Sequence, residues 1–588
     1  MRASLQLTRA HSLVAVTAIT MLLGLCVGCS KKRSGSAHGS SSAAAALPDL
    51  PEPAGILAEL SVARPDATYR TLRELGRPMS GILPAGFPML TASVLGLPPL
   101  TADSFDPALP VVGLLLQTGS SAPSWLLAVH SVSGAELVAR LCTGDRAPFR
   151  AVSSAAPGLR LLEPNPQVQK DAKATPVLAV FDNYLLIAER SESLLAAGPY
   201  AARMLPKRPP SQAAIALRVS HAALTHTAVP ALRGLWAAYR TRLAHQDLTD
   251  RSAHGGRAPD FADPAQVILG ADALVESLLS LLDNASTLEL DFEPFADRLD
   301  LALLVEPEAG SEVRAKLAAL AEADAQTLLK LPAETQFALG LARTEVERQA
   351  AGNVAGEDWV RILGARLSER DAQQLRGVFA DWELGRGTES YYGFLDGSEP
   401  GAFLVTSVAD VGRLKRAGAG FFGLLALPGV RAPLAEFWGR PRVSEPPAPS
   451  GALPEVTRKQ LTFTPKTPGA PPPPALSVAW TVSEQRGFAA ASKNGDATLK
   501  TVLESSRGER DSLGSKVGLA DSVQRIGSRA ALYAYLDARL ALAADGGSRA
   551  AFPAPVLFSI GKREQGAAVR AELAKPALDL ALRGALGH

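Results

Sequence analysis

Several residues and patterns that mark particular protein classes are scarce in this sequence. The 588 residues include three cysteines, and only Cys142 lies beyond the first thirty residues. A single cysteine cannot form a disulfide bond within the chain, so packing must stabilise the body of the protein. Basic and acidic residues number 60 and 58, for a net charge of +2. This balance argues against the basic surface of a nucleic-acid-binding protein, and we expect no nucleic-acid partner.

Motifs of common enzymes are also missing. The sequence has no GxSxG, SxxK, HExxH or P-loop pattern. His221 and His226 are five residues apart, which places them on different faces of a helix rather than in the i, i+4 arrangement of a metal-binding pair. We therefore expect no catalytic residue, no metal and no cofactor. The sequence favours a non-enzymatic protein, with an unrecognised hydrolase as an alternative.

One group of carboxylates raises the question of a calcium site. Glu289, Asp291 and Glu293 alternate with apolar residues, and a second alternating segment spans 299–305. Calcium binds several carboxylate oxygens and could use such a hairpin. The same alternation is typical of a strand with one face in water. We expect the second explanation, with the acidic side chains in water.

Long hydrophobic runs are confined to the N-terminus, and none there or elsewhere reaches the 18 residues that indicate a membrane span. The uncharged segment 13–25 has 13 residues. It follows Arg2 and Arg9, and this order of charge and apolar residues is typical of a secretory signal.

The end of this segment resembles the lipobox of bacterial lipoproteins. Val27 and Gly28 are small residues that precede Cys29, whereas Cys26 stands where leucine is usual. The resemblance implies that residues 1–28 are a signal peptide and that Cys29 carries lipid, palmitate included. It also implies a membrane anchor in the cell envelope, with the body periplasmic or exposed at the surface. Ser30 follows the cysteine, which favours the outer membrane.

Residues 29–52 are rich in Ser, Gly, Ala and Lys, followed by Pro. Such a composition cannot bury enough apolar surface to offset the entropy of ordering. We expect a flexible tether with a reach of about 25 Å.

The remaining chain alternates strand and helix patterns. Two apolar runs of five residues flank Asp182-Asn183, which predicts a hairpin. Long helical patterns occupy about 221–245 and 264–283. Strands joined by short turns and followed by helices predict an α+β fold of antiparallel sheets with helices packed on one face.

Parts of the second half of the sequence match the first. Residues 53–64 and 332–343 align without a gap and are identical at five of twelve positions. Four further strand or hairpin matches follow in the same order. We therefore expect a tandem duplication with halves 53–330 and 332–588, offset by a Pro-rich insertion at 441–475 that we interpret as a surface loop or spacer. The body resembles, in pattern only, large uncharacterised extracytoplasmic bacterial proteins with duplicated strand-hairpin-helix units, and this resemblance implies no site residue.

These features favour a binding or envelope-scaffold lipoprotein, with a carrier of a hydrophobic ligand as the next alternative. The expected partners are the membrane, through the lipid, and an envelope protein or hydrophobic ligand. Phe87 and Leu95 lie in an apolar passage without a regular period and are candidate ligand-lining residues, although core packing would also explain them. We expect a binding groove at the seam between the halves, near Leu331-Pro332.

Overall fold

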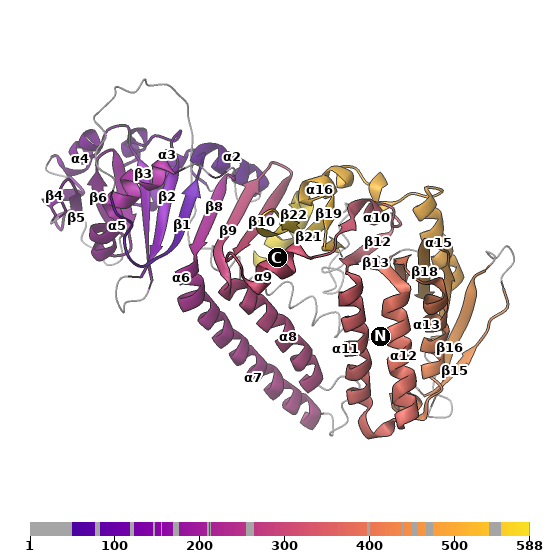
Figure 1. The fold of residues 1–588 in the computed structure, drawn as a ribbon. Coiled ribbons are helices and arrows are strands. Elements are labelled where there is room, and N and C mark those ends of the chain that lie inside the picture. Colours follow the sequence, from indigo (N-terminus) through magenta and orange to yellow (C-terminus); the bar gives the residue numbers. More distant parts are fainter. Residues whose placement is uncertain are drawn as a thin grey trace. The chain divides into compact units, whose positions relative to one another are not determined.

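The computed structural model describes residues 50–586 except 77–82, 118–122, 145–146, 155, 169–175, 209–210, 212, 254–263, 397–399, 438, 449–454, 466–473 and 540–553. The predicted signal peptide, Cys29 and nearly all of the predicted tether lie outside the described residues. Helices make up 42% of the structure and strands 34%, and the sheet is antiparallel, so the predicted α+β fold is confirmed. The chain forms two compact units that divide after Ile215 (Figure 1).

The first unit contains an antiparallel sheet with the strand order β4-β5-β6-β7-β3-β2-β1. Its strands are β1 (Ile56–Val62), β2 (Val111–Leu116), β3 (Ser124–His130), β4 (Phe149–Ser153), β5 (Arg160–Pro164), β6 (Val177–Phe181) and β7 (Tyr184–Ala188). Its α-helices are α2 (Pro65–Leu75), α3 (Phe87–Val94), α4 (Gly134–Cys142) and α5 (Ser191–Arg203). The predicted hairpin is β6–β7, and Asp182 in its turn has a positive φ of 50°.

Both faces of this first sheet are covered. Leu186 on β7 packs in one hydrophobic cluster with Leu194 of α5. Its neighbours Leu185 and Ile187 point to the opposite face and pack with Leu137 of α4. Because successive side chains of a strand alternate between faces, the unbroken apolar sequence of β7 follows from burial on both sides.

The second unit contains a longer antiparallel sheet, ordered β9-β10-β22-β21-β20-β12-β13-β14-β18-β17-β16-β15. Its strands are β9 (Ala285–Pro294), β10 (Arg298–Pro307), β12 (Thr335–Ala342), β13 (Arg386–Leu395), β14 (Gly401–Val408), β15 (Arg440–Ser444), β16 (Thr457–Thr464), β17 (Leu476–Val482), β18 (Arg486–Ser492), β20 (Leu532–Asp537), β21 (Pro555–Arg563) and β22 (Gly566–Ala574). Strand β8 (Ile215–Ser220) lies at the division between the units, and β11 (Ala323–Asp324) pairs with β19 (Arg529–Ala530).

Two pairs of long helices belong to this unit, α7 with α8 and α11 with α12. The α-helices are α6 (His221–Ala223), α7 (Val229–Ala253), α8 (Pro264–Asp283), α9 (Glu312–Ala318), α10 (Ala325–Leu329), α11 (Glu345–Leu363), α12 (Glu369–Gly385), α13 (Val411–Leu424), α14 (Pro428–Phe437), α15 (Gly495–Arg507), α16 (Leu519–Ile526) and α18 (Lys575–Leu586). Helix α11 approaches α12 closely, because a Cβ added at Gly356 would lie 3.2 Å from the Arg376 Cα. A capping box formed by Thr344 and Glu347 begins α11.

No single described helix is long and apolar enough to cross a membrane. Among the described residues, the pair α13 and α14 alone meets those two criteria together, with a bend of 56° between the two helices.

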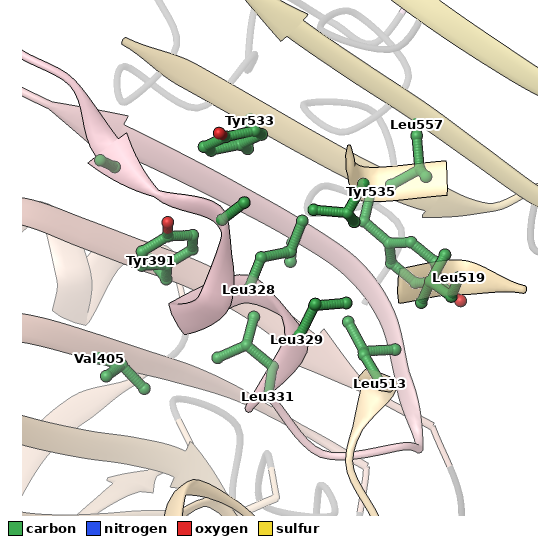
Figure 2. Packing of buried hydrophobic residues seen from close by; sticks show 14 of the residues in the cluster. Leu328, Leu329, Leu331, Tyr391, Val405, Leu513, Leu519, Tyr533, Tyr535 and Leu557 are labelled. Carbon is green, nitrogen blue, oxygen red and sulfur yellow. The ribbon is translucent and has the colours of Figure 1, made fainter. Parts of the chain in front are cut away.

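The main core of the second unit lies between one face of the sheet and helices α10, α15 and α16 (Figure 2). Tyr391 of β13 and Tyr533 and Tyr535 of β20, the two strands that flank β12, extend into this core and are fully buried. Leu328 and Leu513 pack against them from the helical side. These bulky side chains explain why the helices pack on this face of the sheet.

The predicted Pro-rich insertion is not a loop throughout. Residues 440–444 and 457–464 form β15 and β16, which pair with each other and extend the sheet beyond β17. The alternating pattern of 457–464 (TRKQLTFT) is that of a strand, and the nearby prolines obscured it. Strands β12-β13-β14-β18-β17-β16-β15 follow one another in the same spatial order as β1-β2-β3-β7-β6-β5-β4 of the first unit.

Candidate functional site

One face of the second sheet carries apolar side chains that remain partly exposed. On β12, Ala338 and Ala342 are buried in the main core, whereas Leu339 and Leu341 between them are partly exposed. The same alternation holds on β20 and β21, where the residues facing the core are buried and their neighbours are not. The strands are therefore apolar on both faces, and the side chains of one face are more exposed than those of the face that packs on α10, α15 and α16. We call the more exposed face, across β10 to β13, the open face.

The strand register aligns these side chains in three rows, two across six neighbouring strands and one across five. The first row is Leu299, Leu573, Val556, Leu536, Phe337 and Phe394. The second is Leu301, Ala571, Phe558, Ala534, Leu339 and Tyr392, and the third is Leu303, Val569, Ile560, Leu532 and Leu341. With strands about 4.8 Å apart and same-face residues about 6.6 Å apart, the rows cover about 24 Å by 13 Å. This is on the order of the largest apolar patches of monomeric proteins, which are often functional.

Exposure is greatest at the β12–β13 side of the first row. Phe337 on β12 and Phe394 on β13 lie opposite each other in the strand register. Phe337 is 39% exposed and Phe394 is 41% exposed. Paired aromatic side chains normally add to the stability of a sheet by burying their rings. Here both rings retain contact with water, which makes this part of the open face the most accessible to a ligand.

Helices limit the open face at its β10 edge. Leu303 packs in a cluster with Leu281 and Leu282 of α8, and Leu288 of the neighbouring strand β9 is buried in the same cluster. His221 of α6 is held there by a 2.9 Å hydrogen bond between its Nδ1 atom and the Ala285 carbonyl oxygen. The apolar residues of β9 and the end of β10 near Leu303 are therefore covered, and exposure is greatest on β12 and β13.

A group of charged residues lies at the opposite end, where α12 leads into β13. This arginine cluster consists of Arg343, Arg348, Arg386 and Glu383. Arg386 is 1% exposed and donates to the Glu383 carboxylate through Nε at 2.9 Å and through Nη2. Arg386 Nη1 also donates to the Ser390 hydroxyl at 2.9 Å. Arg343 Nη1 lies 3.8 Å from a Glu383 oxygen, so two guanidinium groups approach one carboxylate.

Positive charge exceeds negative charge in the arginine cluster. Arg348 is 6% exposed and donates from Nη1 to the carbonyl oxygens of Glu383 and Arg386. Burial, and then the charge of Arg386, lowers the pKa of Arg348. Burial raises the pKa of Tyr392 on the open face, and the charges of Arg386, Glu383 and Arg343 also act on it. The open face therefore ends beside a positively charged group.

The predicted ligand-lining residues belong to the first unit. Phe87 is the first residue of α3 and Leu95 follows its last residue. Both are partly buried against the cluster that contains Leu97 and Leu137. These contacts are those of core packing, which was the alternative explanation, and a role in ligand binding stays a prediction.

The predicted groove at the seam is not found at its expected position. Leu331 is 2% exposed and belongs to the main core, beside Leu328 and Leu513 (Figure 2). Pro332 is also buried and forms an isolated bridge with Ser512. The chain enters the core again at Leu331, after the exposed C-cap Lys330 of α10.

The acidic hairpin also differs from expectation. The apolar side chains of β10 lie on the open face, whereas its acidic side chains point to the side of α16. Arg298 Nε lies 3.2 Å from the Asp300 carboxylate, and Arg525 Nε lies 2.7 Å from the Glu572 carboxylate on the adjacent strand. Burial raises the pKa of Asp300. An ion pair with arginine accompanies Asp300, and the predicted carboxylates Glu289, Asp291 and Glu293 are half-buried rather than fully in water.

No group of three or more His, Cys, Asp or Glu residues among the described residues could hold a metal ion. A hollow of about 400 Å³ beside β11 is lined by Glu322, Asp324, Thr388, Glu389 and Arg529. Arg486 Nη1 lies 2.6 Å from Glu389, and Arg529 Nε lies 4.0 Å from Glu322. These pairs indicate a structural role for the carboxylates.

The sequence contains a pattern that is consistent with the open face. Strand segments 335–342 and 532–536 are apolar at nearly every position, as expected for strands covered on both faces. Which face stays uncovered depends on tertiary packing, so the sequence pattern alone could not identify it. A scan against models of known families and searches of curated proteins and solved structures give no match to the chain.

Proposed function

We propose that this chain is a non-enzymatic binding protein of the bacterial cell envelope, held at a membrane by lipid on Cys29, and that the open face binds a hydrophobic ligand. The observation that supports this function is a sheet with apolar side chains on both faces, of which the open face is partly exposed along β12 and β13. Exposed apolar area of this extent is unfavourable in water and is commonly retained where a ligand or partner covers it. The exposed position of these side chains favours a ligand carrier over a purely structural scaffold.

Aspartate placed on the open face should weaken ligand binding. The probe is N-phenyl-1-naphthylamine, an uncharged hydrophobic dye whose fluorescence rises on binding. Phe337→Asp should raise its dissociation constant about tenfold or more, because it removes an aromatic contact surface and introduces a charge that must lose water. The matched control is Val346→Asp, since Val346 is 77% exposed on α11 and lies outside the open face.

Circular dichroism and thermal unfolding establish that the variants remain folded. Dye binding by a folded Phe337→Asp variant with the affinity of the original chain would refute the proposed surface. Equal weakening by Val346→Asp would show that the dye binds elsewhere.

The proposed anchor has a separate test. Cells that express Cys29→Ser should incorporate no radiolabelled palmitate into the protein, and the protein should leave the membrane fraction. Cys142→Ser is the matched control, because Cys142 lies in α4 and should not be lipidated. Unchanged palmitate incorporation in Cys29→Ser would contradict the lipoprotein assignment. Fractionation of the original chain then tests whether it resides in the outer membrane.

We also infer a tandem duplication with halves 53–330 and 332–588. Support comes from the five-in-twelve sequence match and from the identical spatial order of seven strands in the two sheets. In this scheme β9–β10 and β21–β22 are equivalent hairpins, and β10 pairs with β22. The open face would then contain strands from both copies.

A further inference from the structure

The open face and the arginine cluster meet at the end of β12. Arg343 follows Leu341 by two residues, so its side chain leaves the strand on the same face. The Arg343 amide still donates to the Thr388 carbonyl oxygen, which shows that the strand pairing continues to this residue. The Arg343 side chain is 37% exposed, whereas Arg348 and Arg386 are buried. A ligand on the open face would therefore encounter the Arg343 guanidinium first.

The charge around Arg343 is not fully balanced within the cluster. The Glu383 carboxylate already accepts two hydrogen bonds from Arg386 and lies 3.8 Å from Arg343. Arg348 Nε is buried and has no hydrogen-bond partner among the described residues. The carboxylate of Glu345 also acts on Arg348, so three guanidinium groups share two nearby carboxylates. An additional anion beside Arg343 would be stabilised by the remaining positive charge.

We propose that the open face binds a long-chain fatty acid, with its acyl chain along β12 and its carboxylate on Arg343. This inference rests on the proposed function, in which the open face binds hydrophobic ligands. A guanidinium presents two parallel N–H groups that match a carboxylate. Leu341, Leu339 and Phe337 provide the apolar track that continues from Arg343.

The dimensions of the track fit such a ligand. From Arg343 to Phe337 the strand rises over six residues, which is about 20 Å. An acyl chain spans about 15 Å in a bilayer leaflet, half of the roughly 30 Å hydrocarbon core. The neighbouring side chains Tyr392 and Leu532 lie beside Leu339 and Leu341 in the strand register and would flank the chain.

Competition between two ligands of the same chain length tests the proposal. Delipidated protein is loaded with N-phenyl-1-naphthylamine, and the dye is displaced by palmitate or by its uncharged methyl ester at pH 8. The concentration of palmitate that displaces half of the dye should be about one tenth of that of the methyl ester, or lower. A hydrogen-bonded ion pair in a partly buried site increases the affinity by at least that factor. Arg343→Gln should remove this preference while dye binding is retained. Arg343→Lys should retain part of it, because the charge remains.

Arg376→Gln is the matched control, since Arg376 is an exposed arginine on α12 that pairs with Glu357. It should leave the preference for palmitate unchanged. Equal displacement by palmitate and its ester in the original chain would overturn the fatty-acid inference and leave the proposed hydrophobic surface standing. Preference for hexadecyl phosphate over palmitate would also overturn it. Failure of the dye itself to bind would refute the proposed function as well.

Discussion

Replacing Glu383 with alanine should lower the free energy of unfolding of the second unit by about 3–5 kcal/mol. Glu383 is the partner of Arg386, whose side chain is 1% exposed. Without the carboxylate, the Arg386 charge would remain buried with the Ser390 hydroxyl as its side-chain contact. A buried charge that loses its partner is strongly destabilising, because water cannot replace the lost interaction.

Urea unfolding followed by tryptophan fluorescence measures this effect, since Trp382 lies next to Glu383 in α12. The matched control is Glu357→Ala, which removes an arginine partner on an exposed surface of the helix pair and should leave the unfolding midpoint nearly unchanged. Similar midpoints for the two variants would show that the Glu383–Arg386 pair contributes little to stability.

Replacing Tyr391 with alanine should cost about 3–5 kcal/mol in the free energy of unfolding. Tyr391 is fully buried in the main core (Figure 2), and its ring lies close to Gly340 of the adjacent strand. A Cβ added at Gly340 would lie 2.4 Å from the Tyr391 Cε1 atom, so glycine leaves the space that the ring fills. Truncation to alanine would remove the ring and leave a cavity.

Tyr391→Phe separates the ring from the hydroxyl. The hydroxyl donates to the Asp324 carbonyl oxygen at 2.8 Å, and its loss should cost about 1 kcal/mol. Thermal unfolding should therefore rank the original chain above Tyr391→Phe and Tyr391→Phe well above Tyr391→Ala. If Tyr391→Ala unfolds at nearly the same temperature as the original chain, the core around Tyr391 must relax to fill the space.

Local patterns were sufficient to predict many elements of this fold. The hairpin β6–β7 follows from two apolar runs around Asp182-Asn183, and the hairpin β9–β10 follows from strict alternation. These features depend on neighbouring residues, which a sequence pattern records directly. The described part of the insertion was misinterpreted because prolines around β15 and β16 suggested a loop.

The position of the candidate site required three-dimensional information. Alternation shows that the residues of β10 fall on two faces, but not which face a helix will cover. We predicted that the acidic side chains of the β9–β10 hairpin face water. In the structure, Arg298 of β10 pairs with Asp300, and Arg525 of α16 pairs with Glu572 on the adjacent strand. The arginine cluster was equally hidden, because Arg343 and Arg386 are brought together only when β12 pairs with β13.

The strand order also determines when the open face can form during folding. Strand β10 ends at Pro307, but its partner β22 begins at Gly566, and β12 pairs with β20 nearly 200 residues later in the chain. Pairings between such distant segments form slowly, because a long loop must close before any contact compensates for the lost entropy. The open face is thus completed only after almost the entire chain is available, and until then β10 and β12 have unpaired edges that can join the wrong strands.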